Sequence, residues 1–273
     1  MLGSSRQYLH PEVVISRESE SSYEVSIVKG LFQYGTSFDN PSTGLRFRVG
    51  PTAEYISTLS GPGPLYARLF SLESNLSLTS HLHEFYAFSP RTGYSLNFNA
   101  AFNNKDLGST VDMQRFSMVG EYLFNFKDFD IPFFVVGARG SLGTIFSSER
   151  TGEDSLIPAN YLYYIGGSQN LRGFGRKSLT LDGQGGMSMG YLGLEFRWVD
   201  NPLPFNFQPL FFYDIGKLGS KPSTLDSPLY YSPGIGLRWQ SPVGSIRGTI
   251  SRGYTQGEEE SKLQFFISLG EEF

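Results

Sequence analysis

Apolar residues that recur at every second position are the feature that most constrains this fold. Near the end of the chain the apolar set is Leu263, Phe265, Ile267 and Leu269, and the residues between include Gln264 and Ser268. Such alternation recurs along nearly the whole chain, and it is typical of strands with two different faces. No run approaches the roughly 18 apolar residues of a membrane helix. The chain is therefore predicted to be all-β.

The residues on the less apolar face separate a soluble sandwich from a membrane barrel. A soluble sandwich would carry many Lys, Glu and Thr on that face, whereas here it carries Gly, Ser, Asn and isolated charges. The apolar face is rich in aromatic residues, which make up 15% of the chain. Outward aromatics and a polar lumen indicate a transmembrane antiparallel β-barrel, in contact with the lipids of the bacterial outer membrane. A large soluble β-protein is the alternative.

Short and long connections alternate along the chain and predict twelve strands. The predicted strands are 7–18, 22–36, 43–59, 64–88, 91–103, 111–126, 131–146, 187–199, 206–216, 229–240, 244–254 and 262–273. Bacterial barrels keep their short turns in the periplasm and their long loops outside, so both ends of the chain are expected in the periplasm. Residues 1–273 are interpreted as a single barrel domain, without a POTRA or passenger domain.

The longest connection, 147–186, is dense in glycine and contains one arginine at Arg172. On the two strands that follow it, Glu195 and Asp214 have the parity of the lumen face. A lone buried arginine is costly, and paired carboxylates offset much of that cost. We therefore expect this extracellular loop to fold into the lumen as a plug, with Arg172 bound to Glu195 and Asp214.

Catalytic and metal-binding patterns are weak. A GxSxG pattern surrounds Ser188, but that motif works only at a strand-to-helix elbow, and Ser188 falls at the start of a predicted strand. His81 and His83 share the lumen parity without an ordered acid and serine partner. The chain has no cysteine, and its three histidines lack metal-ligand spacing. No catalytic residue, metal or other cofactor is predicted, and the absence of a basic stripe disfavours nucleic-acid binding.

Several motifs resemble those of one family. Leu171, Arg172, Gly173 and Phe174 resemble the (V/L)RG(F/Y) motif at the tip of the sixth loop in the BamA/TamA-type insertase superfamily of bacterial surface antigen barrels. That superfamily includes FhaC-type transporters and patatin-like autotransporters. Residues 212–216, FYDIG, match its FxDxG strand motif, and Glu195 lies where its strand glutamate lies. The closing segments 234–239 and 241–244 and the terminal Phe273 also resemble it.

The resemblance is strong from Arg91 to Phe273 and weaker before. Family barrels usually have sixteen strands and follow POTRA domains, or a patatin domain in the autotransporter branch, so twelve strands without either is a departure. The resemblance implies insertion or translocation of polypeptide across the outer membrane. It also implies unfolded or secreted polypeptides as substrates, with periplasmic or lipoprotein partners.

The same resemblance implies a seam between the first and last strands that opens laterally. Pro11 removes one ladder donor there, Gly270 has no side chain to pack, and Phe273 is both a girdle aromatic and an assembly signal. Two alternatives remain: the barrel anchors the passenger of a patatin-like autotransporter, or it is a passive pore.

Overall fold

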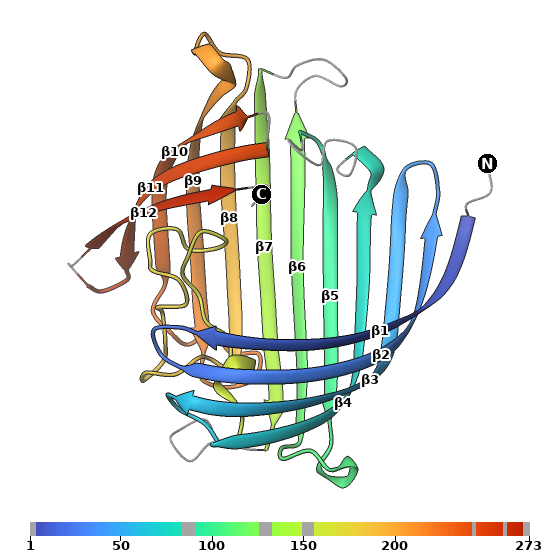
Figure 1. Ribbon diagram of the computed structural model, residues 1–273. Coiled ribbons are helices and arrows are strands. Elements are labelled where there is room, and N and C mark those ends of the chain that lie inside the picture. Colours follow the sequence, from blue (N-terminus) through green and yellow to red (C-terminus); the bar gives the residue numbers. More distant parts are fainter. Residues whose placement is uncertain are drawn as a thin grey trace.

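The computed structural model describes residues 4–82, 91–125, 133–148, 156–241, 244–258 and 261–269. All strands in these ranges belong to one antiparallel sheet of twelve, and each strand pairs with its neighbours in sequence (Figure 1). The sheet curls round so that its first and last strands both cross the front of the view, while the middle strands form the back wall. The expected fold class, a twelve-stranded transmembrane barrel with a long loop in its lumen, is confirmed.

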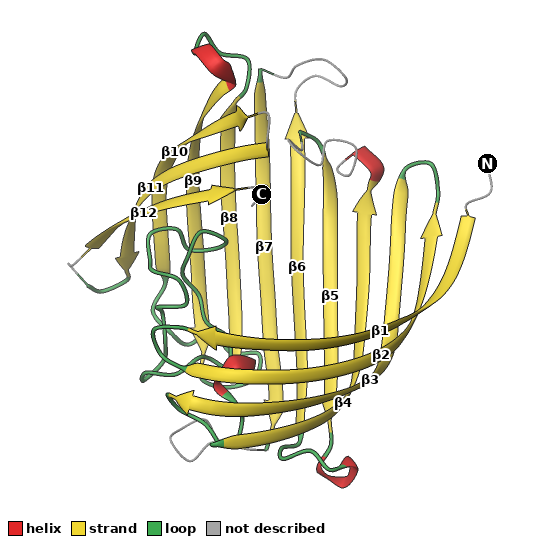
Figure 2. Ribbon diagram, in the orientation of Figure 1, coloured by secondary structure: helices red, strands yellow, loops and turns green. Residues whose placement is uncertain are grey.

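The strands are as follows: β1 Ser4–Ser19, β2 Glu24–Asp39, β3 Thr43–Ser60, β4 Tyr66–Ser80, β5 Gly93–Asn103, β6 Met113–Asn125, β7 Phe134–Ser147, β8 Ser188–Trp198, β9 Phe207–Gly219, β10 Tyr230–Ser241, β11 Gly244–Thr255 and β12 Ser261–Leu269. Three short 3-10 helices lie in the connections: η1 Lys105–Leu107, η2 Ala159–Tyr161 and η3 Pro204–Asn206 (Figure 2). None of the helices in the described ranges is long and apolar enough to cross a bilayer.

Burial is inverted relative to a soluble protein. Large apolar side chains point outward and are exposed, as Phe32, Phe211 and Ile267 illustrate at 52%, 56% and 67%. Charged side chains of the opposite parity, such as Arg197 and Asp214, are buried in the lumen. An apolar outer wall around a polar lumen suits a lipid environment, as the alternation predicts.

The lumen is not polar throughout, which corrects the simple polar-lumen expectation. At the end where the long loops lie, inward residues such as Val25, Ile56 and Leu69 are fully buried. They form one apolar cluster with Ile157 and Ile165 of the loop between β7 and β8. The loop replaces lumen water with apolar contacts there, so the inner face is apolar wherever the loop covers it.

The fourth strand is shorter than the predicted 64–88. It is a single strand, as expected, but its pairing with β3 ends where Ser80 meets Thr43. The backbone N–H of His81 then donates to the carbonyl oxygen of Ser42, in the turn that precedes β3. The ladder stops because the partner strand has begun there. His83 and the rest of the predicted strand lie outside the described residues.

The structure describes all of the predicted first strand but only part of the predicted last strand. β1 begins at Ser4 and pairs with β2 along its whole length, with Pro11 opposite Phe32. β12 pairs with β11 as far as Leu269. Gly270 and Phe273 lie outside the described residues. Within the described ranges, no ladder joins β1 to β12.

Candidate functional site: the lumen loop

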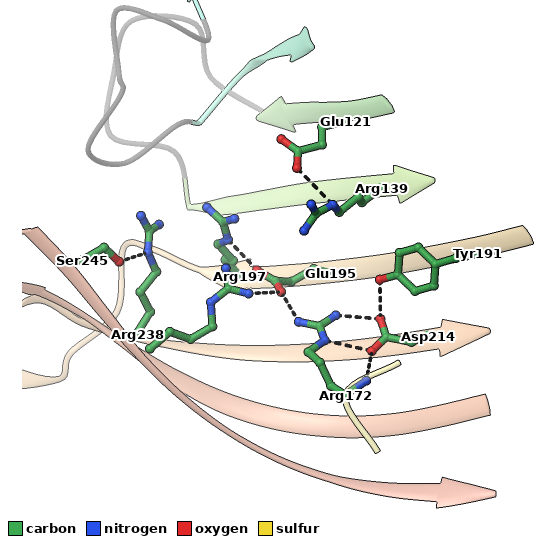
Figure 3. Close-up of polar contacts among 10 residues, drawn as sticks. Glu121, Arg139, Arg172, Tyr191, Glu195, Arg197, Asp214, Arg238 and Ser245 are labelled. Atoms are coloured by element: carbon green, nitrogen blue, oxygen red, sulfur yellow. Dashed lines mark hydrogen bonds and ion pairs between the residues drawn. The ribbon is translucent and has the colours of Figure 1, made fainter. Parts of the chain in front are cut away.

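The loop between β7 and β8 holds its arginine in a buried cage of carboxylates. Arg172 is 2% exposed, and its Nε and Nη2 atoms donate to the two oxygens of Asp214 at 2.9 and 2.8 Å (Figure 3). Its Nη1 donates to Glu195 Oε2 at 2.7 Å, and its backbone N–H donates to Asp214 Oδ2 at 3.2 Å. This fork geometry suits a planar guanidinium and cannot be reproduced by lysine.

The carboxylates are themselves held by neighbouring strands. Tyr191 on β8 donates its hydroxyl to Asp214 Oδ1 at 3.2 Å. Arg197, two residues from Glu195 on the same strand, donates Nε to Glu195 Oε1 at 2.7 Å. Arg247 on β11 donates Nη1 to Glu195 Oε2 at 3.2 Å. The site therefore links β8, β9 and β11 to the loop through one buried polar network (Figure 3).

The aromatic ring of Phe212 stacks on the guanidinium of Arg172. The guanidinium carbon of Arg172 lies 3.5 Å from the ring centroid of Phe212, which is the aromatic residue of the FxDxG motif on β9. Burial alone would lower the pKa of Arg172, but the bonds and charge of Asp214, together with the charge of Glu195, raise it above its ordinary value. The guanidinium is therefore permanently charged, and the cage holds a fixed ion pair.

The residues after Arg172 pack directly on β11. A Cβ atom added to Gly173 would lie 2.5 Å from the Cα atom of Gly253, and one added to Gly253 would lie 2.3 Å from the carbonyl oxygen of Gly173. Phe174 makes an edge-to-face contact with Tyr230 on β10, with ring centroids 5.8 Å apart. Two facing glycines thus allow the loop backbone to touch the strand backbone.

The far side of the loop tip holds the β1–β2 hairpin. Arg176 Nη2 lies 2.9 Å from Glu20 Oε1. Lys177 Nζ donates to the Tyr23 hydroxyl at 2.7 Å and lies 3.3 Å from Glu20 Oε1 and 3.5 Å from Glu18 Oε2. The side chains of Arg176 and Lys177 are 76% and 30% exposed, whereas Glu20 is 5% exposed, so solvent reaches the basic side of this contact but not the Arg172 cage.

A third contact joins the start of the loop to β2, β3 and β4. Tyr161 in η2 donates its hydroxyl to Glu54 Oε2 at 2.8 Å, while Lys29 Nζ lies 3.8 Å from the same oxygen and 2.7 Å from Glu73 Oε1. Burial, and then the charge of Glu54, raise the pKa of Tyr161 well above its ordinary value, so the hydroxyl keeps its proton. The loop is therefore anchored to both halves of the sheet.

The structure brings Arg172, Glu195 and Asp214 together. Beside them in the loop, Gly173 packs on Gly253 of β11 and Phe174 on Tyr230 of β10, while Leu171 is fully buried in the apolar cluster. The sequence reasoning missed Arg247, Tyr161 and the Arg176–Lys177 contact. The inward parity of Arg247 on β11 could have revealed it. The loop residues do not alternate in a regular pattern, so the sequence does not show which way their side chains point.

The serine of the GxSxG pattern lies apart from this site. Ser188 begins β8 without an elbow, and its hydroxyl donates to the carbonyl oxygens of Lys221 and Thr224. Among the residues that the structure describes, no group of three or more acidic or histidine side chains could hold a metal ion.

Residues 74–273 match the Omp85 superfamily domain. The chain belongs to the Omp85 superfamily. Over 126 residues it is 29% identical to the outer membrane protein assembly factor BamA of Nitratidesulfovibrio vulgaris, a match that covers 43% of this chain and 16% of that protein. The resemblance drawn from the motifs is thereby confirmed, and the protein is an outer-membrane barrel.

Solved structures with low sequence identity share the fold. BamA from Haemophilus ducreyi lacking POTRA domains 1–3 has a TM-score of 0.64 at 14% identity, covering 98% of this chain and 68% of that one. CdiB from Acinetobacter baumannii and CdiB from Escherichia coli each score 0.56, at 14% and 16% identity. This chain spans 50% of the length of each CdiB chain.

Proposed function

We propose that this barrel inserts or translocates polypeptide at the outer membrane, through the seam between β1 and β12. The observation that carries the proposal is the pair of strand edges without a mutual ladder in the described residues, beside a lumen loop anchored to both halves of the sheet. An unpaired edge presents N–H and C=O groups that an incoming strand can pair with. Membership of the Omp85 superfamily supports this function.

In this mechanism the lumen loop is a brace and not a catalytic centre. The Arg172 cage fixes the loop on β8 and β9, while the weaker contact with Glu18 and Glu20 holds the hairpin that carries one edge. Movement of that hairpin changes the seam without disturbing the buried ion pairs. The substrates are unfolded or secreted polypeptides, and periplasmic or lipoprotein partners deliver them. No bond is made or broken in this proposal.

Photo-crosslinking from the seam tests the proposal. A photoreactive residue is placed at Val13 on β1 or at Ile267 on β12, both outward and 76% and 67% exposed. Phe211 on β9 is the control, since it is also outward, at 56%, but lies between paired strands. We expect polypeptide adducts from the two seam positions and none from Phe211. Identical adduct patterns at all three positions would refute lateral opening.

A passive pore makes a different prediction. The lumen contains a polar cavity of about 480 Å3 between β1–β6 and Tyr161, but the loop fills the end of the lumen where the long connections lie. Planar-bilayer recordings should therefore show little steady conductance. A large, steady conductance from the intact chain would favour the pore over the insertase.

A further inference from the structure

A row of polar side chains crosses three neighbouring strands on the inner face of the sheet. Ser71 on β4 lies opposite Thr52 on β3 in one ladder and opposite Asn103 on β5 in the next. All three point inward, because their neighbours along the strands, such as Phe70 and Phe102, are exposed on the outer wall. Residues paired in this way have Cβ atoms about 4.5 to 5.5 Å apart, so the three side chains are close neighbours.

This polar row is buried without hydrogen bonds from its side chains. Thr52, Ser71 and Asn103 are 3%, 6% and 5% exposed. Among the residues that the structure describes, none bonds to Thr52 Oγ1, to Ser71 Oγ or to either amide atom of the Asn103 side chain. A buried polar atom that is left unsatisfied destabilises the fold, and such atoms in native proteins are nearly always bonded to protein or to ordered water. The row therefore calls for a polar occupant.

The 3-10 helix η2 of the lumen loop lies across the row. The Tyr161 hydroxyl donates to Glu54, which is the next inward residue after Thr52 on β3. The Tyr161 carbonyl oxygen accepts a bond from Nε of Arg115 on β6 at 3.0 Å. Tyr161 thus reaches from β3 to β6 and crosses β4 and β5, which carry the rest of the row.

The polar lumen cavity of about 480 Å3 ends beside this row. Glu73 and Ala101 line the cavity, and they are the next inward residues along the strands from Ser71 and Asn103. Two residues along a strand correspond to about 7 Å. Asn160 of η2 also lines the cavity, and its Oδ1 atom is buried without a bond from any described residue. Water in the cavity is therefore within a short distance of the row.

The charged groups around the row are paired with one another. Lys29 Nζ lies 2.7 Å from Glu73 Oε1 and 3.8 Å from Glu54 Oε2, and Arg115 is bonded to the loop. The row itself offers two hydroxyl groups and one amide, each of which can both donate and accept. The occupant that fits these groups is small, neutral and able to donate and accept, as water is.

We propose that Thr52, Ser71 and Asn103 form a hydration pocket beneath η2, filled by water from the lumen cavity. Water bridges polar groups that are too far apart to bond directly, and a buried water makes about three hydrogen bonds. The start of the loop is then held on the wall partly through water, whereas the Arg172 cage consists of direct ion pairs. The pocket does not depend on the seam or on polypeptide transport.

X-ray radiolytic labelling of the folded chain in isotope-labelled water tests the pocket, because radiolysis of a bound water oxidises the side chain beside it. Met113 and Met187 both belong to the apolar cluster and are 1% and 5% exposed, but only Met113 lies opposite Asn103. We expect Met113 to be oxidised severalfold faster than Met187. Asn103→Leu removes both amide atoms at nearly constant volume and should slow Met113 to the rate of Met187. Equal rates in the native chain, or an unchanged Met113 rate in folded Asn103→Leu, would overturn the pocket.

Removal of a single hydroxyl group has opposite effects on a wet row and a dry row. Ser71→Ala takes a partner from the bridging water and should lower the temperature at which the compact band is lost on gels. In a dry row the same change removes an unsatisfied oxygen and should raise that temperature. Ser117→Ala is the matched control, since Ser117 is inward on β6 but lines the open cavity, and it should change nothing. An equal or higher temperature for Ser71→Ala than for the native chain would also overturn the pocket.

Discussion

Arg172 is the residue through which the tip of the lumen loop makes its buried ion pairs. Its guanidinium makes three side-chain bonds of 2.7 to 2.9 Å to two carboxylates that are themselves buried. Removing one partner of such a network leaves the other charges buried and uncompensated. The arginine thus acts as the fixed point of the loop, whatever the rest of the loop does.

Arg172→Ala should therefore destabilise the folded barrel by about 3 to 5 kcal/mol, because Asp214 and Glu195 lose their shared partner. Arg172→Lys should recover only part of that loss, since an ammonium group cannot form the two parallel bonds to Asp214. The measurement is the temperature at which the compact band is lost on gels. Arg176→Ala is the control, because the Arg176 side chain is 76% exposed and Glu20 keeps Lys177 as a partner at 3.3 Å, so its loss should cost much less than the loss of Arg172. Equal thermal loss in the control and Arg172→Ala would contradict this assignment.

The facing glycines give a second prediction at this scale. Gly253→Ala should lift the loop from β11, because its Cβ atom would lie 2.3 Å from the Gly173 carbonyl oxygen. Faster proteolysis of the loop in folded barrels is the readout. Gly248→Ala on the same strand is the matched control, since its Cβ atom would meet only Phe265 Cε2, at 4.0 Å. If the loop of Gly253→Ala stays resistant to proteolysis, then β11 moves to accept the added methyl group and the loop does not lift.

At the scale of the elements, the loop tip is held on two sides by contacts of different kinds. Its hold on β8 and β9 is buried and bidentate, whereas its hold on the β1–β2 hairpin is made by Arg176 and Lys177 at the edge of solvent. Exposed pairs are weak and screened by salt. We therefore expect the contact with the β1–β2 hairpin to break before the Arg172 cage does.

Arg176→Ala combined with Lys177→Ala should increase hydrogen exchange in β1 and β2, while the exchange of β8 and β9 stays unchanged. The reason is that the loop loses Glu18, Glu20 and Tyr23 but keeps the Arg172 cage. Arg17→Ala is the control, since its ion pair with Glu24 lies within the same hairpin and does not reach the loop. An equal increase of hydrogen exchange in all strands would contradict the prediction that the two contacts of the loop act independently.

Strand parity was sufficient to predict the cage but not the other contacts of the loop. Alternation fixes which face Glu195 and Asp214 occupy, and adjacent strands place them side by side. Tyr161 and Lys177 belong to an aperiodic segment, so nothing in the sequence indicates that they reach β3 or the hairpin. The end of β4 depended on where β3 begins, which parity does not reveal.

At the scale of the whole molecule, the seam is the boundary at which the sheet ends on both sides. Leu9 on β1 and Ile267 on β12 lie toward the same end of the barrel, since the two strands run in opposite directions along it. The chain contains no cysteine, so paired cysteines can be introduced without background.

Leu9→Cys combined with Ile267→Cys, joined by a disulfide or a short bis-maleimide, should abolish polypeptide insertion into vesicles, because the link holds the two unpaired edges together and an incoming strand can no longer pair with them. Ile235→Cys combined with Ile250→Cys is the control, since these residues already face each other between β10 and β11. Insertion that persists in a fully cross-linked seam would contradict lateral opening.

The two sets of loop anchors also differ in how far along the chain their partners lie. Arg172 finds Glu195 and Asp214 within 23 and 42 residues, whereas Arg176 and Tyr161 reach partners 156 and 107 residues away. Closing the longer connection costs about 1 to 2 kcal/mol more in chain entropy. We therefore expect pulsed hydrogen exchange during refolding to protect β8 and β9 before β1 and β2. The plug would then be a template on which the amino-terminal half of the wall is laid down last.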